Sequence, residues 1–174
     1  YQLFTEHGDM KAQDLGFGMQ LDHVSVMLLF VASFLCLLIS IFSMGYMRTD
    51  KAYWRYFAYL NLFMFSMLLL ILGKNLLVLF IGWEGVGLCS YLLIGFWYDD
   101  GEKAKAGQKA FVTNRIGDFC FLLGTFILLY YSQGDLDFTR LSDLVAPGGA
   151  LSNPANAGTI TLISLLFFGG ACGK

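Results

Sequence analysis

The sequence predicts an all-α fold, namely a polytopic bundle of transmembrane helices with about five spans. Of the 174 residues, 57% are hydrophobic and only 14% are charged. A typical globular chain has about 45–50% hydrophobic and about 25% charged residues. The hydrophobic residues form long runs with few charges, and a helix needs about 20 such residues to cross a bilayer. This composition excludes a soluble enzyme and an intrinsically disordered chain.

Five segments qualify as candidate spans: residues 24–47, 56–73, 75–98, 110–134 and 155–174. Gly73, Lys74 and Asn75 separate the second segment from the third, because Gly and Asn favour turns and a lysine side chain can reach the membrane surface. The connection after the fourth segment contains Pro and Gly loop signals. We expect residues 1–174 to form part of a longer transmembrane domain.

Basic residues in the connections predict how the chain is oriented in the membrane. The connections after the first and third segments carry six of them: Arg48, Lys51, Arg55, Lys103, Lys105 and Lys109. The opposite side carries three: Lys11, Lys74 and Arg140. The side with more Lys and Arg faces the cytoplasm or the mitochondrial matrix. The net charge of −2 gives no basic surface for a nucleic-acid partner.

Four charged residues lie within the candidate spans: Glu84, Arg115, Asp118 and Lys174. A charge inside a bilayer costs at least about 2.5–3.5 kcal/mol, so such residues are candidates for function. Glu84 is either a titratable group in a proton path or a structural carboxylate in a buried ion pair. Arg115 and Asp118 share a helix face and form either an internal ion pair or part of a hydrated polar path. Lys174 is either a proton carrier or a lysine that reaches out from a helix end.

No motif in the sequence indicates a bound cofactor. The glycines around Glu84 follow the order GxxGxG, which differs from the GxGxxG of dinucleotide sites. The four cysteines stand far apart inside apolar runs, without the spacing of a metal or disulfide framework. We therefore expect no cofactor and no metal in this chain.

The segment 75–98, NLLVLFIGWEGVGLCSYLLIGFWY, resembles the large antiporter-like membrane subunits of respiratory complex I. These are NADH dehydrogenase subunit 5 of mitochondria and subunit L of bacterial NADH-quinone oxidoreductase. The resemblance extends to residues 45–47 and 56–63, to 109–118 and to 169–174. It implies the N-terminal part of an antiporter-like inverted-repeat fold, whose chain in that family continues well past the lysine.

The resemblance also implies a function in proton translocation by the respiratory chain. In the family, the glutamate matching Glu84 and the lysine matching Lys174 form a charged pair, and the lysine shuttles protons. The residues matching Asp118 and Arg115 belong to the polar surroundings of that pair. The implied partners are other membrane-arm subunits of complex I and the lipid bilayer, with electron transfer from NADH to quinone in other subunits. The implied location is the mitochondrial inner membrane or the bacterial plasma membrane.

Two other functions are compatible with the sequence. The first is a subunit of a multisubunit sodium/proton antiporter, which would use the same Glu and Lys chemistry without NADH or quinone. The second is a non-transporting structural membrane fragment of a larger assembly. Four charges at membrane depth argue against the second, because a pure scaffold gains nothing from their cost.

Overall fold

The computed structural model describes residues 18–146, 148–149, 151, 153 and 156–174. This part of the chain forms six helices: α1 (His23–Tyr46), α2 (Tyr53–Leu72), α3 (Leu76–Ile94), α4 (Gly101–Tyr131), α5 (Phe138–Val145) and α6 (Ala157–Cys172). The all-α fold expected from the sequence is therefore confirmed.

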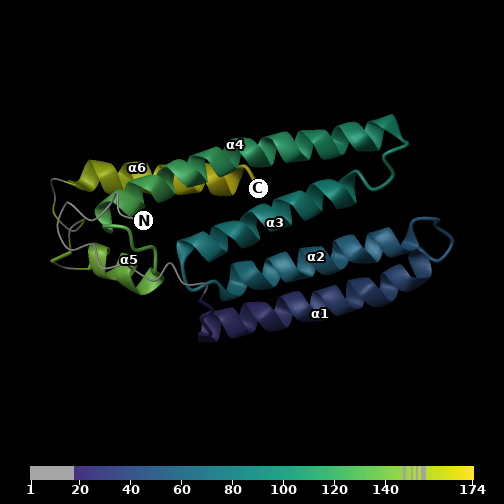
Figure 1. The fold of residues 1–174 in the computed structure, drawn as a ribbon, viewed down its shortest axis with the longest axis horizontal. Helices are drawn as coiled ribbons and strands as arrows, with labels where there is room; N and C mark the ends of the chain where they lie inside the picture. Colours follow the sequence, from purple (N-terminus) through teal and green to yellow (C-terminus); the bar gives the residue numbers. More distant parts are fainter. Residues whose placement is uncertain (1–17, 147, 150, 152, 154–155) are drawn as a thin grey trace, which may run out of the picture.

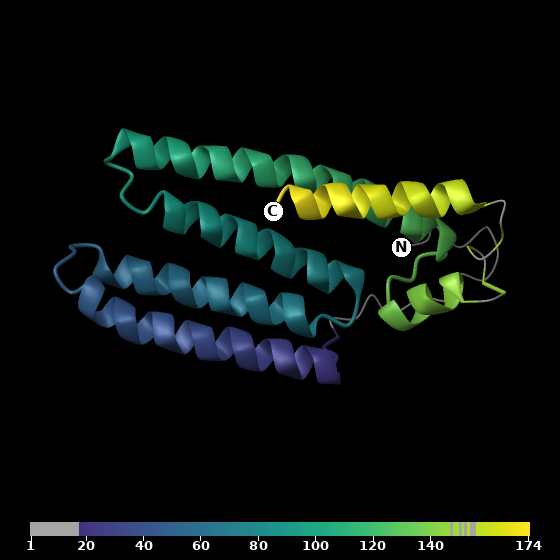
Figure 2. The same ribbon diagram turned by 180° about the vertical axis from the view of Figure 1, so that it is seen from behind.

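The helices α1, α2, α3 and α4 lie side by side in a row in that order, and α6 packs against the C-terminal half of α4 (Figures 1 and 2). Each neighbouring pair in this row packs together. The short helix α5 lies at one end of the row (Figure 1). The helix α6 runs antiparallel to α4 and ends partway along it, which places the residue after α6 inside the row rather than at its end (Figures 1 and 2).

Polar side chains fix the points where three of the helices begin. Asp22, Asn75 and Asp100 are the N-cap residues of α1, α3 and α4, and each side chain accepts a hydrogen bond from a backbone N–H of the first turn. The bond from Val78 N to Asn75 Oδ1 measures 2.8 Å. This cap ends the connection that begins at Gly73, so the turn expected between the second and third segments is present.

Four of the helices, α1 to α4, are long and apolar enough to cross a membrane. The helix α6 is apolar but has 16 residues, so it extends about 24 Å at 1.5 Å per residue. Ser43 is the one buried residue of α1, all of which the structure describes. A helix that is hydrophobic all round requires apolar surroundings, and in a membrane the lipid provides them.

Two predictions about helix boundaries differ from the structure. The helix α4 begins nine residues before the candidate span 110–134, because the charged residues that precede this span continue the helix. The connection 136–154, expected to be a loop, contains α5. This helix was missed because its sequence, FTRLSDLV, is short and amphipathic, with apolar residues three apart along one helix face, and gives no signal of a membrane span.

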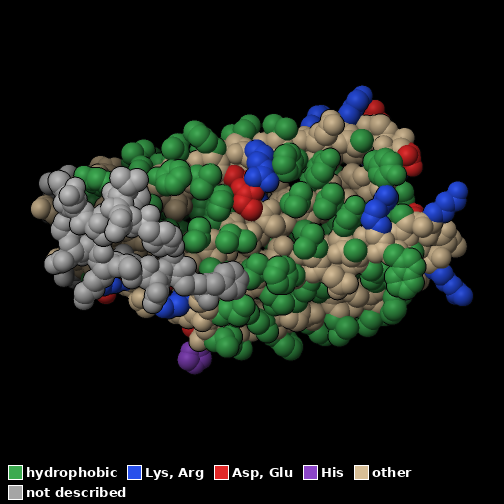
Figure 3. Space-filling model, viewed as in Figure 1, with side chains coloured by type: hydrophobic (Ala, Val, Ile, Leu, Met, Phe, Trp, Pro, Cys, Tyr) green, Lys and Arg blue, Asp and Glu red, His purple; other side chains and the backbone are tan. Residues whose placement is uncertain are grey.

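The connections α1–α2 and α3–α4 lie at the same end of the row of helices (Figure 1). Basic side chains gather at this end, whereas hydrophobic side chains are spread over the middle of this face (Figure 3). At the opposite end, Lys74 forms an ion pair of 2.8 Å with Asp137, which joins the α2–α3 turn to the start of α5.

Candidate functional site

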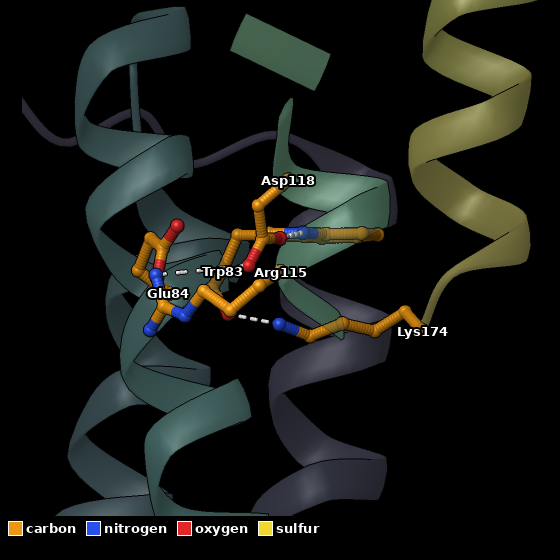
Figure 4. A network of polar contacts seen from close by, with 5 residues as sticks. All are labelled: Trp83, Glu84, Arg115, Asp118 and Lys174. Atoms are coloured by element: carbon orange, nitrogen blue, oxygen red, sulfur yellow. Dashed lines mark hydrogen bonds and ion pairs between the residues drawn. The ribbon is translucent and has the colours of Figure 1, made fainter. Parts of the chain in front are cut away.

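A cluster of four charged residues lies where α3, α4 and the end of α6 meet (Figure 4). Glu84 belongs to α3, Arg115 and Asp118 belong to α4, and Lys174 follows α6. The structure thus brings together all four charged residues that the sequence places within the candidate spans. We call these four residues, together with Trp83, the charged cluster.

Arg115 lies between two carboxylates of the charged cluster. Its Nη1 atom forms an ion pair with Glu84 Oε2 and lies 3.8 Å from Asp118 Oδ2. The side chain of Asp118 is 5% exposed, whereas those of Glu84 and Arg115 are 23% and 43% exposed. The internal ion pair considered for Arg115 and Asp118 is therefore present, and Glu84 extends it across to the neighbouring helix.

Trp83 connects Lys174 to this ion pair. Its indole Nε1–H donates a hydrogen bond of 2.9 Å to Asp118 Oδ1. Its backbone carbonyl accepts a hydrogen bond of 2.6 Å from Lys174 Nζ, and that nitrogen lies 4.9 Å from the centroid of the indole ring, within the range of a cation–π interaction. Figure 4 shows Trp83 between Glu84 and Lys174.

The contact between Glu84 and Lys174 that the family resemblance implied is not formed. Among the described residues, Glu84 pairs with Arg115, which also pairs with Asp118, and Lys174 has no carboxylate within 4.0 Å. The planar guanidinium of arginine suits a carboxylate well, so Arg115 takes the place next to Glu84. Sequence reasoning missed Trp83 because a backbone carbonyl leaves no signal in the residue type.

Glycines make room for the charged cluster. A Cβ atom on Gly87 would lie 2.7 Å from Lys174 Nζ, and one on Gly117 would lie 2.9 Å from both Gly170 O and Gly173 Cα. On the other face of α3, a Cβ on Gly85 would lie 2.5 Å from Ser66 Oγ. The glycines of α3 and α4 therefore allow three helices and the lysine side chain to approach one another closely.

Aromatic rings enclose one side of the charged cluster. Phe121 stacks on Trp83 with ring centroids 5.6 Å apart, and Phe167 of α6 meets Phe121 edge-on at 4.9 Å. The guanidinium of Arg115 lies 4.7 Å from the centroid of the Phe111 ring. These apolar neighbours strengthen the interactions of the buried Asp118 carboxylate in particular, because charges interact more strongly where water is excluded.

The charged cluster contains two acidic and two basic side chains, so their formal charges balance. A balanced set is less costly inside a membrane than single charges. Its carboxylates and its amine can each exchange a proton with water or with a neighbouring group. The described residues contain no group of three or more His, Cys, Asp or Glu side chains that could hold a metal ion.

Two sequence families match the chain. The family described as "NADH:quinone oxidoreductase/Mrp antiporter, TM" matches residues 73–174, which include the whole charged cluster. The family described as "NADH-Ubiquinone oxidoreductase (complex I), chain 5 N-terminus" matches residues 9–57. The two matches follow one another along the chain without overlap.

Individual relatives agree with these matches. NAD(P)H-quinone oxidoreductase chain 5 of Synechocystis sp. is 44% identical over 100% of this chain and 25% of its own length. NADH-quinone oxidoreductase subunit L of Escherichia coli is 42% identical over 92% of this chain and 25% of its own. The chloroplastic NAD(P)H-quinone oxidoreductase subunit 5 of Chara vulgaris is 50% identical over 74% of this chain and 19% of its own length. The chain thus spans about a quarter of the length of the first two relatives.

Proposed function

Because this chain belongs to the family of NADH:quinone oxidoreductase and Mrp antiporter membrane subunits and matches the N-terminal portion of chain 5, we propose that it forms part of a proton-translocating subunit of complex I. It is a multi-pass membrane protein with relatives in bacteria, cyanobacteria and chloroplasts. The observation that carries this proposal is the charged cluster, which places four ionisable side chains of three helices together between apolar helices.

The proposed reaction in this chain is proton transfer, and electron transfer from NADH to quinone takes place in other subunits. Lys174 is the proton carrier: its ammonium group releases a proton to water on one side, and the neutral amine takes up another from the other side. Glu84 and Arg115 control this exchange. While Arg115 holds Glu84, the negative charge of the glutamate is compensated.

A change in the Glu84–Arg115 pair is large enough to alter the protonation of Lys174. At an effective dielectric constant of about 20, two unit charges about 4 Å apart interact by about 4 kcal/mol. This corresponds to about three pKa units at about 1.36 kcal/mol each. If Glu84 leaves Arg115 and approaches Lys174, the proton affinity of the lysine amine changes by an amount of about this size. The redox reaction would drive this movement through the neighbouring membrane subunits.

The proposal can be tested with Glu84→Gln in the complete complex, reconstituted into vesicles. The amide keeps the size of the side chain but removes the charge that acts on Lys174, so we expect fewer protons translocated per NADH oxidised. The matched control is Glu102→Gln in the first turn of α4, where the glutamate is exposed. An unchanged proton yield in Glu84→Gln vesicles would contradict the proposal.

A second candidate is a subunit of a multisubunit sodium/proton antiporter, because the matching family includes Mrp antiporters. Native separation of detergent-solubilised membranes distinguishes the two. Migration with a large NADH-oxidising band supports complex I. Migration in a smaller assembly without NADH oxidation, together with sodium-dependent proton exchange in vesicles, supports the antiporter.

A further inference from the structure

A cavity of about 230 Å³ lies between α2 and α3 at the basic end of the row of helices. Arg55 and Tyr59 of α2 line one wall, and Tyr91 and Leu92 of α3 line another. Phe96 and Tyr98 of the α3–α4 connection also line it. The cavity is separate from the charged cluster, because Tyr91 stands seven residues after Glu84 along α3 and thus about 10 Å further along the helix axis.

The guanidinium of Arg55 forms no ion pair within 4.0 Å among the described residues. Its Nη2 donates a hydrogen bond of 3.0 Å to the backbone carbonyl of Phe96, and its Cζ lies 4.8 Å and 5.0 Å from the ring centroids of Phe96 and Tyr98. Its Nε is buried and has no hydrogen-bond partner among the described residues. Arg55 as a residue is half-buried, so part of its guanidinium remains available to an anion, and an anion would add a charge-assisted hydrogen bond.

At the same end of the helices as Arg55, the carboxylate of Asp50 already has two hydrogen-bond donors. Asp50 accepts hydrogen bonds from Trp97 Nε1 at 2.8 Å and from Ala52 N at 2.7 Å. Among the described residues, no carboxylate oxygen lies within 4.0 Å of the Arg55 nitrogens, since every ion pair of the described part involves other basic residues. The described part of the chain therefore gives Arg55 no direct ion pair, and the Asp50 carboxylate acts on it only at longer range.

The remaining groups of the cavity suit a phosphate with an apolar tail. Arginine offers only donors, and the hydroxyls of Tyr59, Tyr91 and Tyr98 can donate as well. Arg–phosphate hydrogen bonds are charge-assisted and hence strong. Leu92 and the Phe96 ring provide an apolar wall. Trp54 is 82% exposed beside the same end, and exposed tryptophans mark the level of lipid headgroups.

We propose that this cavity binds the phosphate of an anionic phospholipid, with Arg55 as the residue that provides the charge. An anionic headgroup fits better than a zwitterionic one, because this end carries six basic residues against four acidic ones, Asp50, Asp99, Asp100 and Glu102, so its net charge is positive. Basic pockets between transmembrane helices on the cytoplasmic or matrix side favour such lipids. This site is independent of the function proposed above, because it makes no contact with the charged cluster.

The test compares lipid retention in the complete membrane complex purified in mild detergent. Native mass spectrometry counts phosphatidylglycerol bound to the full-length subunit in the wild type, Arg55→Gln, Arg55→Lys and the control Arg48→Gln. Arg48 is an exposed basic residue at the same end and does not line the cavity. We expect Arg55→Gln to weaken retention by at least about tenfold through loss of the charge-assisted bonds. Arg55→Lys should retain more lipid than Arg55→Gln, and Arg48→Gln should behave as the wild type.

Equal retention by Arg55→Gln and the wild type would overturn the proposal. A second measurement needs no variant and covers the case in which Arg55→Gln fails to assemble. Delipidated wild-type complex is supplied with phosphatidylglycerol, with phosphatidylcholine or with inorganic phosphate, and its melting temperature is recorded. A rise in melting temperature with phosphatidylglycerol alone supports the proposal. An equal rise in melting temperature with inorganic phosphate or with phosphatidylcholine contradicts it.

Discussion

Trp83 holds the charged cluster together through two different groups. The indole N–H donates to Asp118, and the backbone carbonyl accepts from Lys174. The side chain thus keeps a buried carboxylate satisfied, while the main chain positions the amine next to it. Because both bonds start from one residue of α3, a shift of α3 moves the carboxylate environment and the lysine together. In this way the structure can couple the surroundings of the Asp118 carboxylate to the position of Lys174.

Gly87 gives a test of the lysine position. A Cβ at Gly87 would lie 2.7 Å from Lys174 Nζ, so Gly87→Ala displaces the ammonium group from the Trp83 carbonyl. The lysine tip can move aside, and alanine favours a helix by about 1 kcal/mol over glycine. We therefore expect the thermal stability of the complex to change little, while the proton yield per NADH oxidised falls severalfold.

The matched control for Gly87→Ala is Gly45→Ala in α1, where an added Cβ would meet nothing within 4 Å. Its proton yield should equal that of the wild type. If Gly87→Ala also kept the full proton yield, the position of Lys174 at the Trp83 carbonyl would not matter for function.

The sequence predicts the four charged members of the cluster and offers the pairing of Arg115 with Asp118 on one helix face, but it does not predict the pairing between helices. Glu84, Arg115, Asp118 and Lys174 stand out because each is a charge within an apolar segment. Which carboxylate meets which cation depends on the rotation and depth of three helices, and the spacing along one chain does not contain that information. The hydrogen bond to the Trp83 carbonyl is hidden for the same reason.

The crossing of α4 and α6 depends on glycine at Gly117. A Cβ at this position would lie 2.9 Å from Gly170 O and from Gly173 Cα, and backbone atoms cannot move aside as a side-chain tip can. Gly117→Ala should therefore separate the two helices and destabilise the protein by about 1–3 kcal/mol, as overpacking does. Equilibrium unfolding in mild detergent measures this change.

Gly158→Ala provides the comparison for this variant. Gly158 lies in α6, where an added Cβ would meet nothing within 4 Å. We expect this variant to be as stable as the wild type or slightly more stable. Equal stabilities for Gly117→Ala and Gly158→Ala would mean that the close crossing is not required.

A hydrogen bond joins the two connections at the basic end of the helices. Trp97 Nε1–H donates to Asp50 Oδ2 at 2.8 Å, and this bond lowers the pKa of the Asp50 carboxyl from its ordinary value of 3.8. A carboxyl with a lowered pKa in the folded state stabilises the fold above its ordinary pKa. That contribution is lost as the pH falls through the lower, folded value.

We expect the indole N–H resonance of Trp97 to shift as the pH is lowered below 4, with a midpoint under the ordinary pKa of aspartate. Asp50→Asn should remove this titration, since the amide still accepts a hydrogen bond but has no charge to lose. A Trp97 resonance that titrates equally in Asp50→Asn would show that another group is responsible.

The length of an apolar run predicts most helices of this fold. Helical segments that lack such a run are the ones that the sequence analysis misses. The helices α1, α2 and α3 coincide closely with apolar runs. The first residues of α4 and the whole of α5 are polar or amphipathic, so hydropathy cannot find them. The row in which the helices pack (Figure 1) results from contacts between distant segments, such as the glycine crossings, which no local pattern specifies.

At the scale of the whole molecule, the described helices place the charged cluster far from both ends of the row. Figure 3 shows charged side chains in the middle of a largely hydrophobic face, apart from the basic end. We expect the six basic residues to face the cytoplasm or matrix, which places the cluster between the two membrane surfaces. A proton that crosses the membrane along this chain would therefore have to pass the cluster.

The most direct test of this account is proton translocation by the complete complex with Lys174→Met. The side chain keeps its length but loses the amine that exchanges the proton, and protons moved per NADH oxidised are measured in reconstituted vesicles. The control is Lys105→Met, an exposed lysine near the start of α4. The account predicts a strong loss of proton translocation in Lys174→Met and none in Lys105→Met. Full proton translocation by an assembled Lys174→Met complex would contradict it.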